Sequence, residues 1–120
     1  MIKIIQGLPD NTLGFEAGGK VTGNDYETVL IPAVEEKLKA FPKVRLLYHL
    51  GSDFTGYDME AMWDDTKIGL KHLKAWERIA VVSDTEWIRK AVHIFGFTMP
   101  GRVRVFKNEE LSGAKKWLSE

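Results

Sequence analysis

Cysteine is absent from this chain of 120 residues, and its absence removes several kinds of chemistry. Without thiols the chain forms no disulfide bond, has no thiolate nucleophile and offers no cysteine ligand to a metal ion. The amino-terminal residues, MIKIIQGLPD, lack the long apolar core of a secretory signal peptide. We therefore expect a cytoplasmic protein.

Long hydrophobic runs and an excess of one charge are also missing. No apolar stretch approaches the roughly 20 residues that a membrane-spanning helix needs, so we expect any membrane contact to be peripheral, at the inner face. The 17 basic and 17 acidic residues cancel without forming long runs, which argues against a nucleic-acid-binding surface. The length suits a single domain, residues 1–120, that buries roughly two-thirds of its unfolded surface.

The stretch from Val44 to Thr55 organises the chain. Its first seven residues, Val44 to Leu50, are apolar at most positions on both faces, which is typical of an interior strand covered on both sides. Gly51-Ser52-Asp53 then breaks the pattern, so we predict a strand-to-helix loop there. In open α/β sheets such loops are where ligands and partners usually bind.

Alternating and helical patterns on either side of this strand predict the remaining elements. These are a hairpin with Ile2 and Ile4 in one strand and Leu13 to Ala17 in the other, helices over residues 24–40 and 57–74, a strand over 79–82, a helix after Ser83, a strand around Val103 and Val105, and a final helix capped by Asn108. The order β-β-α-β-α-β-α-β-α predicts an α/β fold. Its sheet is mixed but mostly parallel and five-stranded, with an N-terminal antiparallel hairpin.

Local signals place the helix ends and one irregularity. Asn24 with Glu27, and Ser83 with Glu86, have the spacing of a capping box. Pro32 lies inside the first helical pattern, where it removes a backbone donor, so we expect a bend near residues 28–29.

Large apolar side chains gather at two places, the start of the helix over residues 57–74 and the end of the helix after Ser83. The candidate ligand-binding residues are Phe54, Tyr57, Met59, Met62, Trp63, Ile94, Phe95, Phe97 and Met99. One interpretation is ordinary core. The other is a gap between the two helices, or an exposed patch, that takes an acyl chain, a partner or a bilayer surface.

Polar candidates for chemistry are scattered. His49, His72 and His93 belong to three different elements, which predicts no metal site. The acidic residues near the end of the central strand are best interpreted as a charged loop and a solvated helix face; they are Asp53, Asp58, Asp64 and Asp65. No nucleophile elbow, phosphate-binding loop or nucleotide fingerprint occurs. We therefore predict no catalytic residue, no metal and no cofactor, and expect that the protein is not an enzyme.

Six short segments together resemble the bacterial SpoIIAA-like family of STAS-type domains, over nearly the whole chain. They are Phe54-x-Gly56, Ala61-x-Trp63-Asp64, Gly69-x-x-His72, Arg78-Ile79-Ala80-Val81-Val82-x-Asp84-x-x-Trp87, Pro100-Gly101-x-x-Arg104-x-Phe106 and Ala114-x-x-Trp117-Leu118. The resemblance implies a small α/β fold related to anti-sigma-factor antagonists and similar to the lipid-binding part of CRAL-TRIO domains. It also implies a non-enzymatic role, with association to apolar ligands or membrane surfaces.

STAS antagonists of the best-known kind carry a phosphorylatable serine in an Asp-Ser-Ser-Gly-like turn, and that signature is absent from this chain. Ser52 or Thr55 would be the acceptor here, near the amino end of the following helix, where backbone donors favour an anion. The alternative is that these residues serve only as a turn residue and a helix cap.

The sequence thus predicts a non-catalytic binding module whose second and third helices gate a site for an apolar, lipid-like or fatty-acid-like molecule. Peripheral membrane contact and a homodimer are expected with it. The alternative function is a protein-interaction regulator controlled by phosphorylation at Ser52 or Thr55.

Overall fold

The computed structural model describes residues 1–65, 67, 68 and 71–120 in full and residues 66, 69 and 70 by their backbone alone. Its five strands form one sheet in the order β1-β2-β3-β4-β5. They are β1 (Ile2–Ile4), β2 (Thr12–Val21), β3 (Val44–Tyr57), β4 (Trp76–Val82) and β5 (Arg102–Phe106). The β1–β2 pair is antiparallel and the other three pairs are parallel, which confirms the predicted topology with its central third strand.

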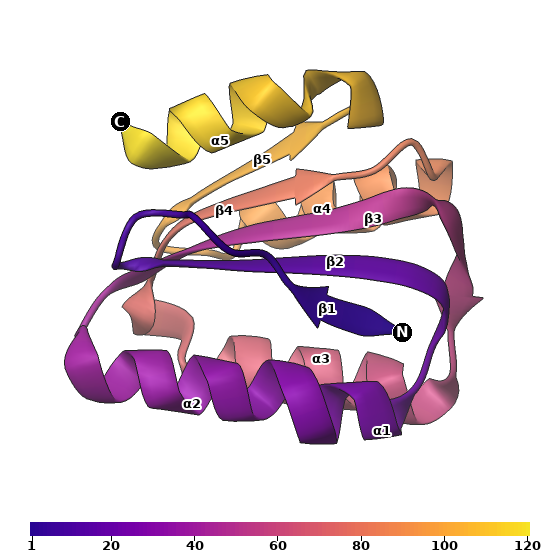
Figure 1. The fold of residues 1–120 in the computed structure, drawn as a ribbon, viewed down its shortest axis with the longest axis horizontal. Helices are drawn as coiled ribbons and strands as arrows, with labels where there is room; N and C mark the ends of the chain where they lie inside the picture. Colours follow the sequence, from indigo (N-terminus) through magenta and orange to yellow (C-terminus); the bar gives the residue numbers. More distant parts are fainter.

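Helices cover both faces of the sheet (Figure 1). They are α1 (Gly23–Asp25), η1 (Tyr26–Leu30), α2 (Ile31–Ala40), α3 (Met59–Lys71), η2 (Leu73–Ala75), α4 (Glu86–Gly96), η3 (Asn108–Glu110) and α5 (Leu111–Ser119). Two apolar clusters follow from this layering: a large one that joins the sheet to η1, α2, α3 and α4, and a smaller one under α5.

The central strand β3 serves both clusters, as its alternating side chains predict. Val44, Tyr48 and Leu50 belong to the large cluster, whereas Leu47 belongs to the cluster under α5. Successive side chains of a strand point to opposite faces, so one strand supplies the floor of two separate cores.

The predicted loop at Gly51 is wrong, because β3 continues to Tyr57. The partner strand β2 runs on to Val21 and pairs with the extension, with Gly19 opposite Phe54 and Val21 opposite Tyr57. Register shifts flank Gly19, whose φ of 58° is a conformation that favours glycine. Pairing with the long strand β2, which has a bulge at Gly19, therefore keeps Gly51-Ser52-Asp53 in the sheet.

The helix caps also differ from those predicted. Thr22, not Asn24, begins the first helical segment: its Oγ1 accepts from the Asp25 amide at 3.2 Å, and Asp25 accepts from the Thr22 amide at 2.9 Å. The Oγ of Ser83 accepts from the Thr85 amide, and α4 starts only at Glu86.

Asn108 does not cap the last helix either, because it is the first residue of the 3-10 turn η3 that precedes α5. The irregularity expected before Pro32 takes the form of a π-helical turn over Tyr26–Leu30. Each of these corrections moves an element boundary by a few residues and leaves the order of elements unchanged.

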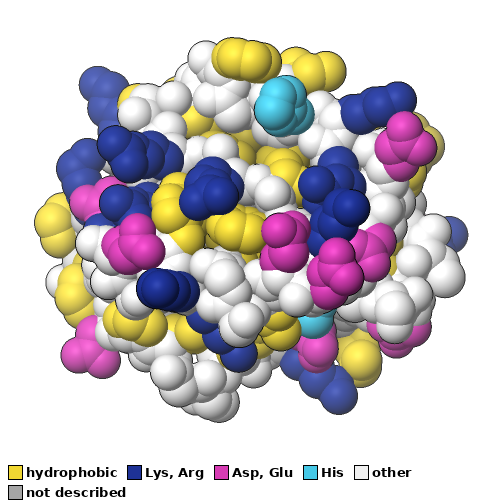
Figure 2. All heavy atoms as spheres, turned by 90° about the horizontal axis from the view of Figure 1, so that it is seen from above, with side chains coloured by type: hydrophobic (Ala, Val, Ile, Leu, Met, Phe, Trp, Pro, Cys, Tyr) yellow, Lys and Arg dark blue, Asp and Glu magenta, His cyan; other side chains and the backbone are white. Residues whose placement is uncertain are grey.

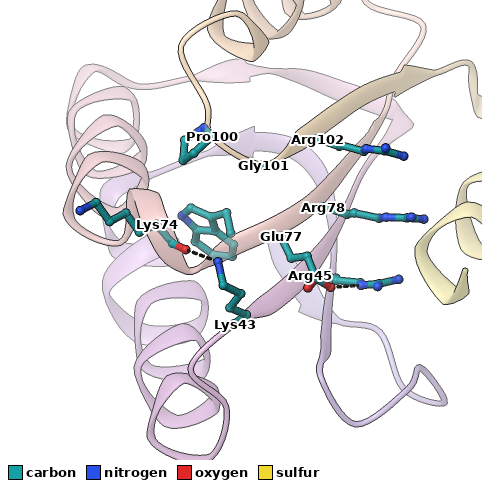
Figure 3. Close-up of a pocket in the computed structure, with 9 residues that line it drawn as sticks. Lys43, Arg45, Lys74, Glu77, Arg78, Pro100, Gly101 and Arg102 are labelled. Carbon is teal, nitrogen blue, oxygen red and sulfur yellow. Dashed lines mark hydrogen bonds and ion pairs between the residues drawn. The ribbon is translucent and has the colours of Figure 1, made fainter.

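Arginines on neighbouring strands tie α5 to the sheet. Arg45 Nη1 donates to the Leu118 carbonyl and Arg78 Nη1 to the Trp117 carbonyl, each at 2.6 Å. The Arg78 guanidinium also lies 5.2 Å from the centre of the Trp117 ring. In Figure 3 the side chains of Arg45, Arg78 and Arg102 lie side by side and point the same way. The last turn of a helix leaves carbonyls without intrahelical partners. Arg45 supplies a donor to the Leu118 carbonyl, and Arg78 adds one to the Trp117 carbonyl, which also accepts from the Glu120 amide at 3.3 Å.

Replacement of Arg78 by Met should destabilise the fold, because it removes a charged donor from a helix-end carbonyl. We expect the Arg78→Met change to lower the free energy of unfolding by about 1–3 kcal/mol, as measured by urea denaturation. Arg102 is exposed in the same row and makes no side-chain hydrogen bond or ion pair with the described residues. Arg102→Met should therefore change the free energy of unfolding by less than about 0.5 kcal/mol. If both variants lost the same stability, the assigned role of Arg78 would be contradicted.

Candidate ligand-binding cavity

A cavity of about 400 Å³ lies between the sheet and the helices on the face opposite α5. Ligand pockets usually span roughly 300–1,000 Å³, so the space suits a small organic molecule. Its wall is mostly apolar and consists of Phe15, Leu30, Val34, Leu46, Tyr48, Leu50, Tyr57, Met62, Asp65, Ile68, Trp76, Ile79, Val81, Trp87, Ile88, Ala91, Val92, Phe95, Thr98 and Val103.

The cavity opens between α3 and α4. Met62 of α3 and Trp87 of α4 both line it while remaining 51% and 47% exposed. Ala91, also on α4, lines it and is exposed. The Trp87 ring meets the Tyr57 ring edge to face, with 6.2 Å between their centres. These side chains form an entrance to the cavity. The flexible thioether of Met62 can adapt to the shape of an apolar ligand.

Three tyrosines and one aspartate form a hydrogen-bonded chain beside this cavity. Tyr26 Oη donates to Asp65 Oδ1 at 2.6 Å and lies 2.9 Å from Tyr48 Oη. Tyr57 Oη donates to Tyr48 Oη at 3.2 Å. The chain joins η1, β3 and α3, so it holds together three elements that enclose the cavity.

Burial shifts the acidity of every member of this chain. Desolvation raises the pKa of Tyr26, Tyr48 and Tyr57, and the negative charge of Asp65 raises these pKa values further. Desolvation by the surrounding protein also raises the pKa of Asp65, an effect that the Tyr26 hydrogen bond partly offsets. The Asp65 side chain lines the cavity and is solvent-accessible.

The predicted ligand-binding residues occupy three environments. Tyr57, Met62 and Phe95 line the cavity, which brings the two predicted groups together. Phe54 and Met99 are buried in the core. The remaining four are exposed on or just beyond α3 and α4: Met59, Trp63, Ile94 and Phe97. A ligand role for these residues stays a prediction.

Sequence reasoning missed the polar part of the site. Tyr26 and Tyr48 fall within a predicted helix and the predicted central strand without any polar role, and Asp65 is interpreted from the sequence as part of a charged loop and a solvated helix face. A signal was present, since a buried tyrosine hydroxyl normally requires a hydrogen-bond partner. Nothing in the sequence, however, says that Asp65 rather than Asp64 supplies it.

Ser52 and Thr55 lie in β3 and are exposed. Their predicted place near the amino end of the following helix is wrong, because the strand extends past them. Asp58 occupies that helix end instead, where its Oδ1 accepts from the Ala61 amide at 2.7 Å. A carboxylate at this position disfavours a second anion beside it.

The three histidines lie apart from the cavity lining. His72 Nε2 is 3.4 Å from Glu35 Oε1 and His49 Nδ1 is 3.9 Å from Glu16 Oε1, and both carboxylates are substantially exposed. The His93 ring meets the Phe97 ring edge to face. Neither carboxylate–histidine pair has the burial that general acid–base chemistry would need.

Asp64 corrects the expectation of a solvated helix face, since it is 7% exposed and its Oδ2 is buried without a hydrogen bond from the described residues. One oxygen each from Asp64, Glu27 and Glu60 lie within 4.8 Å of one another, close enough to contact a single divalent cation. A hydrogen bond with Glu27 and the repulsion between their carboxylates raise the pKa of Glu60. Asp53 is exposed on β3, with its carboxylate against Gly18.

A second hollow, of about 370 Å³, lies at the other end of the parallel strands and is lined mainly by cationic side chains. Glu77 neutralises Arg45 through a 2.6 Å ion pair, and Lys43 Nζ donates to the Lys74 carbonyl (Figure 3). Viewed from the α5 side, lysines and arginines alternate with acidic and apolar side chains (Figure 2). The charges of this hollow thus serve largely in internal contacts.

In the part of the chain that the structure describes, we find no helix with the length and apolar character needed to cross a bilayer.

Comparisons with known proteins place the chain in a family. The family model described as SpoIIAA-like matches residues 12–119. The fold is similar to the 2.25 Å crystal structure of an uncharacterized protein of the DUF3478 family with a SpoIIAA-like fold, from Shewanella loihica PV-4. That protein is 32% identical, the match covers 98% of this chain and 92% of the other, and the TM-score is 0.79. The search of curated proteins gave no match.

The raised pKa of Asp65 predicts a pH-dependent stability. The folded state holds the Asp65 proton more tightly than the unfolded state does. The contribution of Asp65 to the free energy of unfolding therefore falls as pH rises above about 3.9, the ordinary aspartate pKa. Asp65→Asn removes the titration and keeps an oxygen for Tyr26. Urea denaturation should therefore show the variant gaining stability relative to the parent between pH 4 and pH 7; a constant difference would contradict the shift.

Proposed function

Because this chain belongs to the SpoIIAA-like family, we propose that it is a non-catalytic binding module that takes an apolar or lipid-like molecule into the cavity between α3 and α4. The observation that carries the proposal is the cavity itself. It is largely apolar, has a volume of about 400 Å³ and opens beside two half-exposed side chains, Met62 and Trp87. A packed protein interior rarely leaves such a space empty.

The proposed ligand reaches the cavity from a membrane surface. Apolar side chains are also exposed at the outer ends of the two helices: Met59 at the start of α3 is 88% exposed and Phe97 just beyond α4 is 83% exposed. Exposed apolar groups of this size on the two helices that border the cavity support contact with lipid or protein. We include in the proposal a peripheral, cytoplasmic membrane association, and a homodimer through the same side chains when no membrane is present.

Control by phosphorylation is the less favoured alternative. Ser52 and Thr55 are exposed, which would allow modification. Asp58, however, already occupies the helix end that would stabilise a phosphate. Labelling by a kinase together with a change in partner binding that Ser52→Ala and Thr55→Ala both abolish would favour this alternative.

A substitution at the entrance should block ligand uptake. Ala91 lines the cavity and is exposed, so Ala91→Phe places a ring in the opening without disturbing the buried core. We expect it to weaken binding of the neutral fluorescent probe N-phenyl-1-naphthylamine at least about tenfold, which corresponds to about 1.4 kcal/mol. Fluorescence titration measures this, and native mass spectrometry of the purified parent protein tests for a retained ligand.

Ala40→Phe is the matched control, because Ala40 is exposed at the end of α2 and does not line the cavity. It should bind the probe like the parent protein. A parent protein that neither binds the probe nor retains a ligand would end the proposal.

The exposed apolar side chains should govern membrane association. Full burial of a phenylalanine side chain is worth roughly 1.5–3 kcal/mol, so Phe97→Ser should reduce partition into liposomes about tenfold or more. Sedimentation with phosphatidylcholine–phosphatidylglycerol vesicles measures the bound fraction. Ile4→Ser, at an exposed apolar position on the edge strand β1, should leave it unchanged. Equal losses, or no binding by the parent, would contradict membrane contact.

A further inference from the structure

We propose that the cavity selects apolar molecules whose head group donates a hydrogen bond, namely a long-chain alcohol or amine, and that it disfavours a free fatty acid. The inference rests on the proposed function, since it specifies the ligand of the same cavity. It comes from the direction of the hydrogen bonds among Tyr26, Tyr48, Tyr57 and Asp65.

Each tyrosine hydroxyl has a single proton to donate, and an ionised carboxylate has none. Tyr26 gives its proton to Asp65 Oδ1 across 2.6 Å. The 2.9 Å bond between Tyr26 and Tyr48 must then carry the proton of Tyr48, and the 3.2 Å bond between Tyr57 and Tyr48 carries that of Tyr57. All three phenolic protons are therefore committed in one direction, toward Asp65.

What this chain leaves for a ligand is acceptor capacity. Tyr57 Oη donates its proton but receives none, and the second carboxylate oxygen of Asp65 receives no hydrogen bond from the described residues. Both side chains line the cavity. The hydroxyl of Thr98 adds no free donor, because it donates to the Phe95 carbonyl at 2.8 Å. Tyr57 and Asp65 thus present oxygens without protons to the cavity.

Two indole N–H donors also line the cavity. The indole of Trp87 belongs to the half-exposed entrance and makes no hydrogen bond with the described residues. The indole of Trp76 lies at the other end. Trp76 Nε1 is buried without a hydrogen bond from the described residues. Trp76 begins β4, whereas Tyr48 pairs with Val81, five residues further along that strand. At about 3.3 Å per residue the two backbone positions are roughly 16 Å apart. The Trp76 indole cannot therefore supply a proton to a head group that sits beside Asp65.

Charge reinforces this preference. In a largely apolar cavity two negative charges repel more strongly than in water, and an ammonium group beside a carboxylate is correspondingly favoured. A carboxylate head group would bring a second anion and further acceptors to a place that already has both. An alcohol would donate to Asp65 or Tyr57 without any charge, and an amine would add the ionic attraction.

A panel of ligands with one chain length tests the inference on the full-length protein. Displacement of N-phenyl-1-naphthylamine is measured at pH 7 with n-decylamine, n-decanol, methyl decanoate and decanoic acid, each below its micelle concentration. The amine and the alcohol should compete roughly tenfold or more better than the acid. The ester, which is neutral but has no donor, should fall below the alcohol.

Asp65→Asn provides the variant, because it removes the charge, keeps an oxygen for Tyr26 and adds an amide donor. The preference for n-decylamine over decanoic acid should shrink about tenfold in this variant, while n-decanol changes little. Thermal unfolding followed by circular dichroism verifies that the variant folds. The ligand order of the parent protein tests the inference even without the variant.

The outcomes separate the two claims. If the probe enters and all four ligands displace it equally, or decanoic acid displaces it best, the inference is overturned while apolar binding stands. If Asp65→Asn folds and leaves the order of the ligands unchanged, Asp65 does not set the selectivity, and the inference is likewise overturned. If the probe does not bind the parent protein, the proposed function and the inference fall together.

Discussion

The hydrogen-bonded chain from Tyr57 through Tyr48 and Tyr26 to Asp65 is the interaction on which the site depends. It links β3, η1 and α3 on one side of the sheet. Three phenol hydroxyls at this place would be costly without these bonds, since unpaired polar groups in an apolar interior destabilise the fold. Once paired, they keep polar oxygens inside a layer that is otherwise apolar. The same bonds fix the position of α3, one of the two helices that border the entrance.

The two faces of the sheet are closed in different ways. Under α5, short side chains and the Phe106 and Trp117 rings fill the space, and arginines from β3 and β4 hold the helix end. On the other face a cavity remains between the sheet and the helices α3 and α4. A SpoIIAA-like fold supports a non-catalytic regulatory or binding module, and the cavity on the open face is the place that we propose for such binding.

The order of elements and the sheet topology could be predicted from the sequence, because each strand and helix carries its own apolar period. The alternation of Leu47 with Tyr48 even predicted that β3 would serve two cores. The extension of β3 to Tyr57 could not be predicted, because it depends on pairing with β2, far away in sequence, and on the bulge at Gly19. The long-range pairing of β2 with β3 overrides the local turn preference of Gly51-Ser52-Asp53.

The candidate site was predictable in kind but not in detail. The concentration of large apolar side chains near residues 54–63 and 94–99 indicated where the helices would border a gap, and Tyr57, Met62 and Phe95 do line it. Which aromatic side chains turn inward depends on helix rotation by a fraction of a turn, so Trp63 and Phe97 face outward instead. The position of Asp65 depends on the tyrosines of two other elements, which no local pattern connects.

The central claim is that the space between α3 and α4 is a binding site and not a packing defect. A crystal structure of the protein, purified without delipidation, tests it most directly. We predict continuous electron density for an elongated molecule along the cavity, with its polar end beside Asp65 and Tyr57. A cavity that has closed, with Met62, Trp87 and Phe95 turned inward to fill it, would contradict the account.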